Sequence, residues 1–297
     1  MKRNELGPFA PDDSRKISGV PASIKVPRKV RDHGFTLIEL LVVIAVLGLL
    51  AALLLPGLNR AKEKAQQVDC MSRQKQWAMA FRMYVDDHDN LIPREGYRGF
   101  GGVQWDTWSM VRGRPASATN ESDDIWYNAL PQYVGVPSAA EYVFPLSKHK
   151  DFYRPASLFH CPSAKFPPDR DIIDEKYVIA HFSIAMNSQL IEYPHGPTIN
   201  FDRIRDEESR TVLFLDNLLE GEKKVHVWQE YEYWGQPAAY ADRFSARHSG
   251  VGNLAFADGH VSWFPGNKVV ETNPDSPLRG GPIMPPTDIV WEPKYDF

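Results

Sequence analysis

The most apolar stretch of the chain covers residues 35–55, and its only charged residue is Glu39. As a helix, these 21 residues would be about 31 Å long, which matches the roughly 30 Å hydrocarbon core of a bilayer. We therefore predict a transmembrane helix. An acid inside such a helix is costly and is by default a sign of function. The alternative is that Glu39 lies at the level of the lipid headgroups and does nothing.

A second helical pattern follows the apolar stretch, beyond the helix-weakening residues Pro56 and Gly57. Apolar side chains recur there at spacings of three, four and seven, which place them on one helical face. They are Leu58, Ala61, Ala65, Val68, Met71, Ala78, Phe81 and Val85. We predict one helix from Phe35 to near Asp87, bent at Pro56, whose outer half (residues 56–89) packs one face against a head domain.

The polar run at residues 86–90, Asp-Asp-His-Asp-Asn, ends the predicted helix and offers oxygen ligands. A calcium loop of the EF-hand type beginning at Asp87 would need glycine where Ile92 stands and a glutamate at its twelfth position, which is absent. We expect a solvated turn here, and the sequence predicts no metal site and no cofactor.

Residues 90–264 form the predicted head. Residues 93–150 are rich in Gly, Pro, Trp and Tyr and indicate irregular structure, whereas residues 211–216 read as a strand. Alternating apolar residues on both sides of Asp258-Gly259 predict a β-hairpin with a two-residue turn. The expected fold class is α+β, with the long helix packed on a small antiparallel sheet of about four strands. The Pro-rich residues 265–297 form a tail that either wraps the head or lies loose.

Charge and length bear on the topology. A chain of 297 residues with 43% hydrophobic residues can bury a sizeable core outside the membrane. Residues 1–34 carry a net charge of +4 in a chain of net −4, so the remainder carries −8 and nucleic acid is not an expected partner. Four basic residues just before the apolar stretch favour a cytoplasmic N-terminus and an outer head; they are Lys25, Arg28, Lys29 and Arg31. Arg60, Lys62 and Lys64 follow the stretch and count against this, so charge alone does not decide the orientation.

The chain has two cysteines, Cys70 and Cys161, both on the outer side of the predicted membrane helix. In an oxidising compartment such a pair predicts a disulfide, which would tie the stem helix to the head. The alternative is a pair of free, buried thiols.

Residues 31–40, RDHGFTLIEL, resemble the type IV prepilin signature, and the chain thereby resembles type IV pilins and the pseudopilins of type II secretion. The resemblance implies a leader, residues 1–34, that a prepilin peptidase removes by cutting between Gly34 and Phe35, followed by methylation of the Phe35 nitrogen. It also implies that Glu39 pairs with the terminal nitrogen of a neighbouring subunit, and that Pro56 lets the stem bend or melt during assembly. The implied partners are the peptidase, other pilin or pseudopilin subunits and an inner-membrane assembly platform.

His248 stands nine intervening residues before Asp258-Gly259, a spacing that resembles a processing-associated domain found fused to prepilin signals. A recurring His and Asp invite an acid–base reading, but only Ser249 stands beside them as a candidate nucleophile, and by adjacency alone. We predict no catalytic residue and no enzyme. The expected role is structural: Asp258 shapes the turn, and His248 hydrogen-bonds across to Asp258.

The sequence thus favours a structural pilin-like subunit, anchored in the bacterial inner membrane with a periplasmic head and assembled into a type II secretion pseudopilus or a type IV pilus. The alternative is a membrane-anchored binding module, for example for a polysaccharide. That alternative depends on Trp105, Trp108, Trp126 and Tyr127, which could stack on sugars but as an aromatic cluster are more often core residues.

Overall fold

The computed structural model describes residues 36–94, 125–143, 149–166, 172–174, 177–178, 181–190, 200–229, 235–283 and 288–292. The predicted cleavage site, Gly34 and Phe35, lies outside the described residues, as do Trp105 and Trp108. The chain divides into two compact units, Met1–Leu53 and Leu54–Phe297.

Helix α1 runs from Leu37 to Asp87 and contains Pro56 within it, which confirms the predicted long N-terminal helix. It is the one helix among the described residues that is long and apolar enough to cross a membrane. Every residue from 36 to 65 is exposed, so no described part of the chain covers the apolar stretch. The bend at Pro56 stays a prediction.

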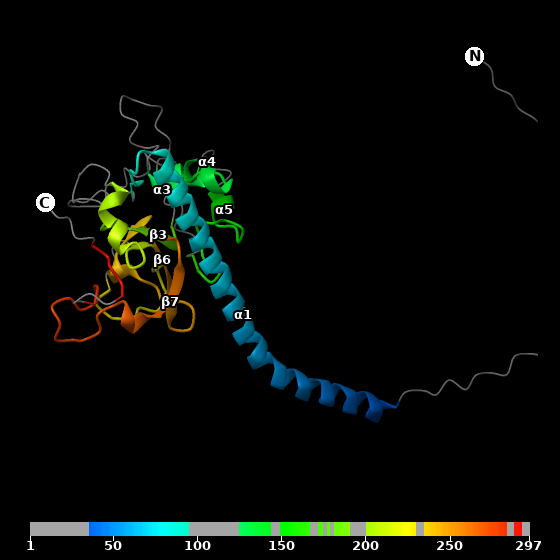
Figure 1. Cartoon of the computed structure of the whole chain (residues 1–297). Coiled ribbons are helices and arrows are strands. Elements are labelled where there is room, and N and C mark those ends of the chain that lie inside the picture. The colour runs from blue at the N-terminus through cyan, green and yellow to red at the C-terminus, as the bar shows by residue number, and fades with distance from the viewer. Residues whose placement is uncertain are drawn as a thin grey trace, which may run out of the picture. The chain divides into compact units, whose positions relative to one another are not determined.

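The head contains a five-stranded sheet in the order β5-β3-β4-β6-β7, part of which is labelled in Figure 1. Its strands are β3 (Ile184–Asn187), β4 (Val212–Asp216), β5 (Ala238–Ala239), β6 (Val251–Phe256) and β7 (Val261–Pro265). The order β3-β4-β6-β7 is antiparallel throughout, as predicted, whereas the two-residue strand β5 adds a parallel edge to β3. The α+β class is confirmed, with a mixed rather than a purely antiparallel sheet. Strands β1 (Ile172–Asp174) and β2 (Tyr177–Val178) form a separate pair.

The hairpin of β6 and β7 forms where it was predicted, but its turn is different. The Phe256 N–H donates to the His260 carbonyl (2.9 Å), and the Gly259 N–H donates to the Phe256 carbonyl (2.8 Å). Of the two turn residues Asp258 and Gly259, the glycine alone has a positive φ, at 86°. The connection is therefore a three-residue loop closed by a left-handed glycine, a common hairpin connection after the two-residue turn.

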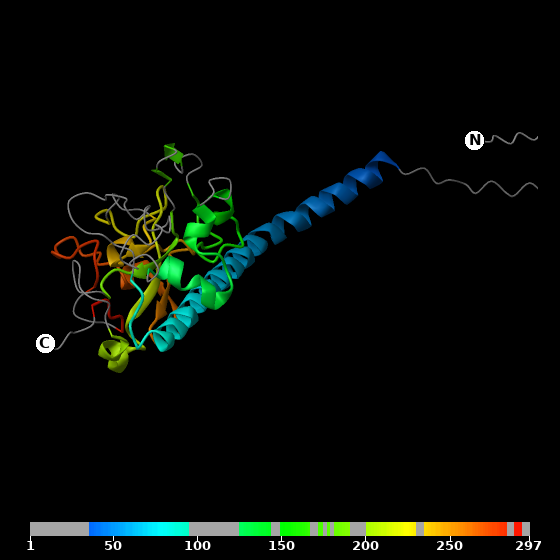
Figure 2. The same cartoon turned by 90° about the horizontal axis from the view of Figure 1, so that it is seen from above.

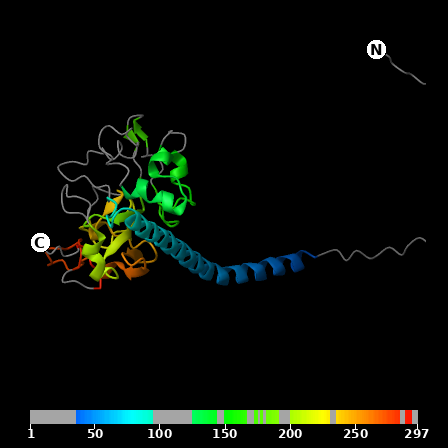
Figure 3. The ribbon, with the colours of Figure 1, turned by 45° about the horizontal axis from the view of Figure 1, so that its top comes forward.

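The outer half of α1 packs on one face of the sheet. Trp77, Phe81 and Val85 of α1 share a core with Met186 of β3 and Phe214 of β4. Four short helical segments close this core: α3 (Trp126–Ala129), η1 (Pro131–Val134), α4 (Ala139–Val143) and α5 (His149–Phe152). Figures 2 and 3 show this green group of segments near the cyan end of α1.

The opposite face of the sheet is covered mainly by the C-terminal residues. Val269, Ile289 and Trp291 join a second core with side chains of β4 and β6. The Val212 N–H donates to the Val290 carbonyl (3.0 Å), so the described tail pairs with the start of β4. Short 3-10 turns, η3 (Phe201–Glu207), η4 (Ala241–Arg243) and η5 (Gly266–Lys268), connect these layers. Of the two alternatives, the described tail wraps the head.

The buried stripe of α1 begins later and is more polar than the sequence predicted. Leu58, Ala61, Ala65 and Val68, all expected on the packed face, are exposed. The stripe instead begins with Gln67, Cys70, Arg73 and Gln74. Arg73 is buried because its guanidinium donates to three loop carbonyls, those of Pro155 (2.6 Å), Ser157 (2.7 Å) and His160 (2.7 Å). Apolar periodicity misses such positions, since a polar side chain can be buried only when a partner elsewhere in the fold bonds to it.

Candidate functional site

Glu39 forms a reciprocal cap at the first turn of α1. The Thr36 N–H (2.8 Å) and the Thr36 hydroxyl (2.7 Å) both donate to Glu39 Oε2, while the Glu39 N–H donates to Thr36 Oγ1 (3.3 Å). This is a capping box, which satisfies backbone donors that a helix N-terminus otherwise leaves without partners. Glu39 therefore has an intramolecular role that the sequence reading did not consider. The pattern Thr-x-x-Glu was the available signal.

The capping bonds occupy only one carboxylate oxygen of Glu39. Both Thr36 donors reach Oε2, and none of the bonds described here uses Oε1. The surrounding apolar side chains are uncovered, with Leu37 87% and Ile38 70% exposed. Such a surface needs a membrane or another protein to cover it.

In the head, four side chains from four separate segments meet in one buried cluster: Cys70 on α1, Cys161 in the loop after α5, Asp216 at the end of β4, and His248 just before β6. One potential ligand atom from each lies within 4.8 Å of all the others. We call this group the Cys-His-Asp cluster. It combines the types of side chain that hold transition-metal ions.

Asp216 is the centre of the Cys-His-Asp cluster. Its Oδ1 accepts hydrogen bonds from the Cys70 thiol (3.0 Å) and Gln74 Nε2 (3.0 Å), and its Oδ2 accepts one from the Asn253 backbone N–H (2.8 Å). His248 Nε2 lies 3.6 Å from Asp216 Oδ2. The same Nε2 lies 3.3 Å from the Cys161 sulfur. Every residue of the cluster is at most 4% exposed.

Burial and mutual contact shift the ionisation of the cluster. Burial raises the pKa of the Cys70 thiol well above its usual range, and raises the pKa of the Asp216 carboxyl to about 6. Burial also acts to raise the pKa of the Cys161 thiol, but hydrogen bonds with Cys70 and His248 outweigh it and hold that pKa well below its usual range. For His248, burial is outweighed by Cys161 and Asp216, so its pKa is raised. The arrangement therefore favours a negative Cys161 sulfur beside a positive His248 ring.

The cluster does not have the geometry of a catalytic Cys-His-Asp relay. In such a relay the acid orients one ring nitrogen while the other nitrogen faces the nucleophile. Here the same nitrogen of His248, Nε2, faces both Asp216 and Cys161. Ser249, the adjacent candidate nucleophile, donates to Glu63 instead (2.7 Å). What the geometry offers is a set of atoms converging on one point.

Two expectations about these residues are corrected. His248 was expected to bond to Asp258, but its ring faces Cys161 and Asp216 instead, because it precedes β6 and points into the core. Asp258 does shape the hairpin turn, through bonds to the His260 backbone (2.9 Å) and ring (2.6 Å). The predicted disulfide is not formed: Cys70 and Cys161 are both free and buried. Their proximity in space is nevertheless as expected.

Asp216 is the functional candidate that sequence reasoning missed. It closes a strand whose other four residues, Val-Leu-Phe-Leu, are all buried and apolar. A carboxylate at the end of such a strand is itself a signal, since a buried acid is retained only with partners. The sequence could not show which residues those partners are, because they lie 146 residues before (Cys70) and 37 residues after (Asn253).

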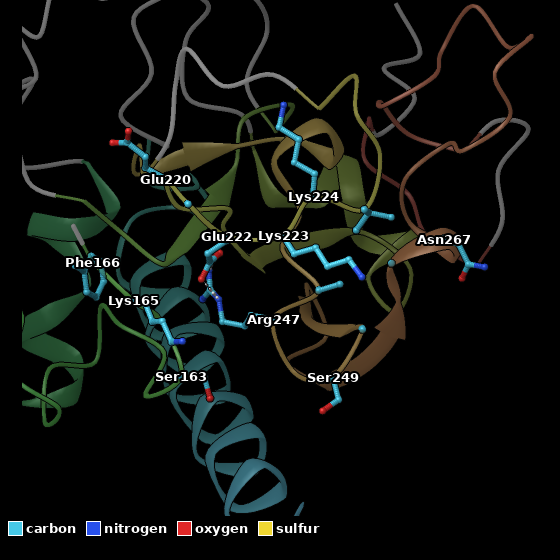
Figure 4. A pocket seen from close by; sticks show the side chains of 15 residues that line it. Ser163, Lys165, Phe166, Glu220, Glu222, Lys223, Lys224, Arg247, Ser249 and Asn267 are labelled. Atoms are coloured by element: carbon cyan, nitrogen blue, oxygen red, sulfur yellow. Dashed lines mark hydrogen bonds and ion pairs between the residues drawn. The ribbon is translucent and has the colours of Figure 1, made fainter. Parts of the chain in front are cut away.

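A cavity of about 920 Å³ lies near the loops that carry Cys161 and His248 (Figure 4). Its wall includes Ser163 and both sequence neighbours of His248, Arg247 and Ser249. Arg247 is paired with Glu222 through contacts of 2.9 and 3.0 Å, drawn as dashed lines in the figure. Lysine side chains contribute to the rim; they are Lys165, Lys223 and Lys224.

The remaining sequence candidates carry no site in the described structure. Trp126 and Tyr127 are fully buried, and the Trp126 ring packs against Trp77 and Phe214 at centroid distances of 5.5 and 5.3 Å. Asp89 adopts a left-handed backbone (φ 51°) in the turn that ends α1, as a solvated turn would.

Comparison with known proteins gives a consistent set of matches. Residues 29–55 match the family described as the prokaryotic N-terminal methylation motif. The type II secretion system core protein G of Aeromonas hydrophila is 44% identical over 68 residues, which are 23% of this chain and 48% of that protein. Its counterpart from Pectobacterium carotovorum subsp. carotovorum is 42% identical over 65 residues, 22% of this chain and 42% of that protein. The chain thus spans about half the length of these two relatives.

The match to core protein G of Dickeya chrysanthemi is longer: 33% identity over 112 residues, which are 38% of this chain and 67% of that protein. No solved structure matches the chain significantly. An uncovered apolar helix that begins within a methylation motif and continues into an α+β head defines a pilin-like protein. The chain belongs to the type II secretion pseudopilin family represented by core protein G.

Proposed function

We propose that this protein is a structural subunit of a type II secretion pseudopilus or a related type IV pilus. The observation that carries the proposal is the uncovered helix of residues 36–65, which is capped at its start by Thr36 and Glu39 and whose first part lies within the methylation motif of residues 29–55. In this proposal a prepilin peptidase cuts between Gly34 and Phe35 and methylates the new terminal nitrogen. The helix then first anchors the subunit in the inner membrane and later packs against other subunits.

Glu39 sets the register of that packing. A charge placed among apolar helices is retained when it is paired. The cap uses Oε2 of Glu39. Oε1 is left to accept a hydrogen bond from the positively charged Phe35 nitrogen of a neighbouring subunit. Side-by-side stems would cover Leu37, Leu41 and Ile44, which are 87%, 61% and 60% exposed.

Pro56 supports a stem that changes shape during assembly. A proline within a helix cannot donate to the carbonyl four residues earlier, here that of Ala52. Gly57 adds a second helix-weakening residue. We expect bending or local melting to concentrate at this point of α1.

The head would stand in the periplasm and the leader in the cytoplasm, as the leader's basic residues favour. The net charge of −8 outside the leader argues against nucleic acid as a partner. The expected partners are the prepilin peptidase, other pilin or pseudopilin subunits that contact the N-terminal helix, and an inner-membrane assembly platform.

The alternative of a glycan-binding module loses support. Trp126 and Tyr127 are fully buried and offer no face to a sugar ring. The other two aromatic candidates, Trp105 and Trp108, lie outside the described residues.

The proposal is tested by expressing the chain with its host's secretion machinery and shearing filaments from the cells. A pseudopilus or pilus subunit enters the sheared fraction, and stays in the membrane as the longer precursor when the peptidase gene is deleted. Retention of the chain in the membrane at unchanged length in both strains would exclude the proposal.

A further inference from the structure

We propose that the Cys-His-Asp cluster binds a divalent transition-metal ion of the zinc type, which fastens the stem helix to the head. The four ligands would be Cys70, Cys161, His248 and Asp216. This inference concerns the head and is independent of whether the helix assembles into a filament.

The chemistry of the donors selects the class of metal. Two sulfurs and one imidazole nitrogen are the ligands that structural zinc sites use, and a carboxylate oxygen also serves as a zinc ligand. Calcium and magnesium prefer sets made of oxygens. A site with two sulfurs therefore favours zinc or a metal of similar softness.

The spacing of the ligand atoms suits a tetrahedral ion. Zinc bonds of about 2.3 Å to sulfur and about 2.0 to 2.2 Å to nitrogen or oxygen place neighbouring ligand atoms about 3.3 to 3.8 Å apart. The Cys161 sulfur lies 3.3 Å from His248 Nε2, and that nitrogen lies 3.6 Å from Asp216 Oδ2. The Cys70 sulfur lies 3.0 Å from Asp216 Oδ1, and all four ligand atoms are within 4.8 Å of one another. Small side-chain movements would open the cluster around an ion.

The ligands are held in place by bonds that do not involve a metal. The Asn253 N–H fixes Asp216 (2.8 Å), and the Cys161 N–H donates to Ser183 Oγ (2.6 Å). The His248 backbone bonds to Val251 in both directions, at 3.0 and 3.2 Å. Outer contacts of this kind orient the ligands of metal sites.

Charge also favours an ion at this point. The cluster brings one carboxylate and two thiols together among side chains that are at most 4% exposed. The neighbouring guanidinium of Arg247 is already bonded to both oxygens of Glu222. A divalent cation would take the place of the protons on the thiols and on His248, which would leave to solvent, and would neutralise the carboxylate and the resulting thiolates.

The cavity in Figure 4 is lined by residues of the two loops that carry Cys161 and His248. Ser163 follows Cys161 by two positions, and Arg247 and Ser249 flank His248; all three line that cavity. The two loop ligands thus belong to segments that border open space, whereas Cys70 and Asp216 lie on the helix and the strand.

The consequence of binding would be a stem locked to its head. Cys70 belongs to α1, Asp216 to the central strand β4, and the other two ligands to connecting loops. One ion would therefore join segments that are up to 178 residues apart in the sequence. Because such a site does not exist in the unfolded chain, the binding free energy adds to folding stability.

The experiment uses the detergent-solubilised full chain purified without reductant. We expect one zinc ion per chain after dialysis against metal-free buffer. After removal of the metal with a chelator, addition of Co²⁺ should give the visible absorption of a tetrahedral site together with sulfur-to-cobalt charge-transfer bands. Alkylation of the two thiols should be slow with metal bound and fast after chelation.

Matched variants locate the ligands. Cys161→Ser and His248→Gln should lose the stoichiometric metal, whereas His260→Gln should keep it. His260 also pairs with an aspartate, Asp258, but lies in the exposed hairpin turn. The cobalt spectrum is measured on the wild-type chain, so it tests the proposal even if a variant fails to fold. Three results would each overturn the proposal: absence of stoichiometric metal, a cobalt spectrum without thiolate bands, or a wild-type chain that shows no titratable thiols when it is unfolded in the presence of chelator but not reduced. The last result would show a disulfide instead.

Discussion

The Cys70 thiol on α1 donates a hydrogen bond of 3.0 Å to Asp216 Oδ1 at the end of β4. The two residues are 146 positions apart, and both are fully buried. Their contact joins the stem helix to the central strand of the sheet. It is one of the bonds that fix the part of α1 belonging to the head to the rest of the fold.

Gln74 offers a test of that junction without touching a cysteine. Gln74 Nε2 donates to the buried Asp216 carboxylate at 3.0 Å, so Gln74→Met keeps the side-chain volume but removes a donor. We expect the free energy of unfolding to fall by about 1 to 3 kcal/mol. Gln76, on the same helix, is not buried and serves as the control. Gln76→Met should change the free energy of unfolding by less than about 0.5 kcal/mol. Guanidinium denaturation of the full chain in detergent, followed by tryptophan fluorescence, measures both; equal effects would contradict this role of Gln74.

Arg73 should be one of the most sensitive polar positions in the head. Arg73→Met would leave the carbonyls of Pro155, Ser157 and His160 without their donor, and we expect a loss of about 3 kcal/mol. The control is Arg154→Met, which breaks an exposed pair with Asp151 and should cost no more than about 1 kcal/mol. The same denaturation experiment measures both variants. A loss at Arg73→Met no larger than that at Arg154→Met would contradict the prediction and show that water replaces the bonds of Arg73.

Gly259 should resist substitution for a backbone reason. Its φ is 86°, so Gly259→Ala should destabilise the head by about 1 kcal/mol or more. Gly259→Asn should be milder, since asparagine tolerates left-handed backbone better than alanine does. Thermal unfolding of the two variants measures the difference; an alanine variant as stable as the asparagine variant would contradict the three-residue turn.

Glu39 can be divided into a capping role and a charge role. Glu39→Gln keeps an oxygen that accepts from Thr36 but removes the charge, so it should insert into the membrane and fail to enter filaments. Thr36→Ala weakens the cap but keeps the carboxylate, and it should still assemble. Comparing the sheared and membrane fractions by immunoblot separates the two roles. Normal assembly of Glu39→Gln would show that the charge does not set the register.

Local sequence patterns predicted the parts of the fold that depend on nearby residues. The apolar run and the helical spacing after it predicted α1, with a start two residues before the observed one. Asp258-Gly259 predicted the position of the β6–β7 hairpin. The predicted start of the buried stripe on α1 was wrong. Arg73, for example, is buried because it donates to the carbonyl of Ser157, 84 residues away in the sequence. No local pattern contains that information.

The candidate site shows the same division. Cys70, Cys161 and His248 could be named as candidates from the sequence. The motif spacing, however, led to the prediction that His248 bonds to Asp258, ten positions further along the chain. The fold pairs His248 with Asp216 and Cys161 instead, since the antiparallel pairing of β4 with β6 brings the end of β4 beside the start of β6. Strand order, which decides that contact, is not encoded in the spacing of the motif.

The mass of the mature N-terminus shows whether the chain is cut between Gly34 and Phe35. The protein would be extracted from membranes of cells with and without the prepilin peptidase, and its N-terminal peptide analysed by mass spectrometry. We predict a chain that begins with N-methylated Phe35 in the first strain, and one that keeps residues 1–34 in the second. A mature chain that begins elsewhere, or one that is the same in both strains, would contradict it.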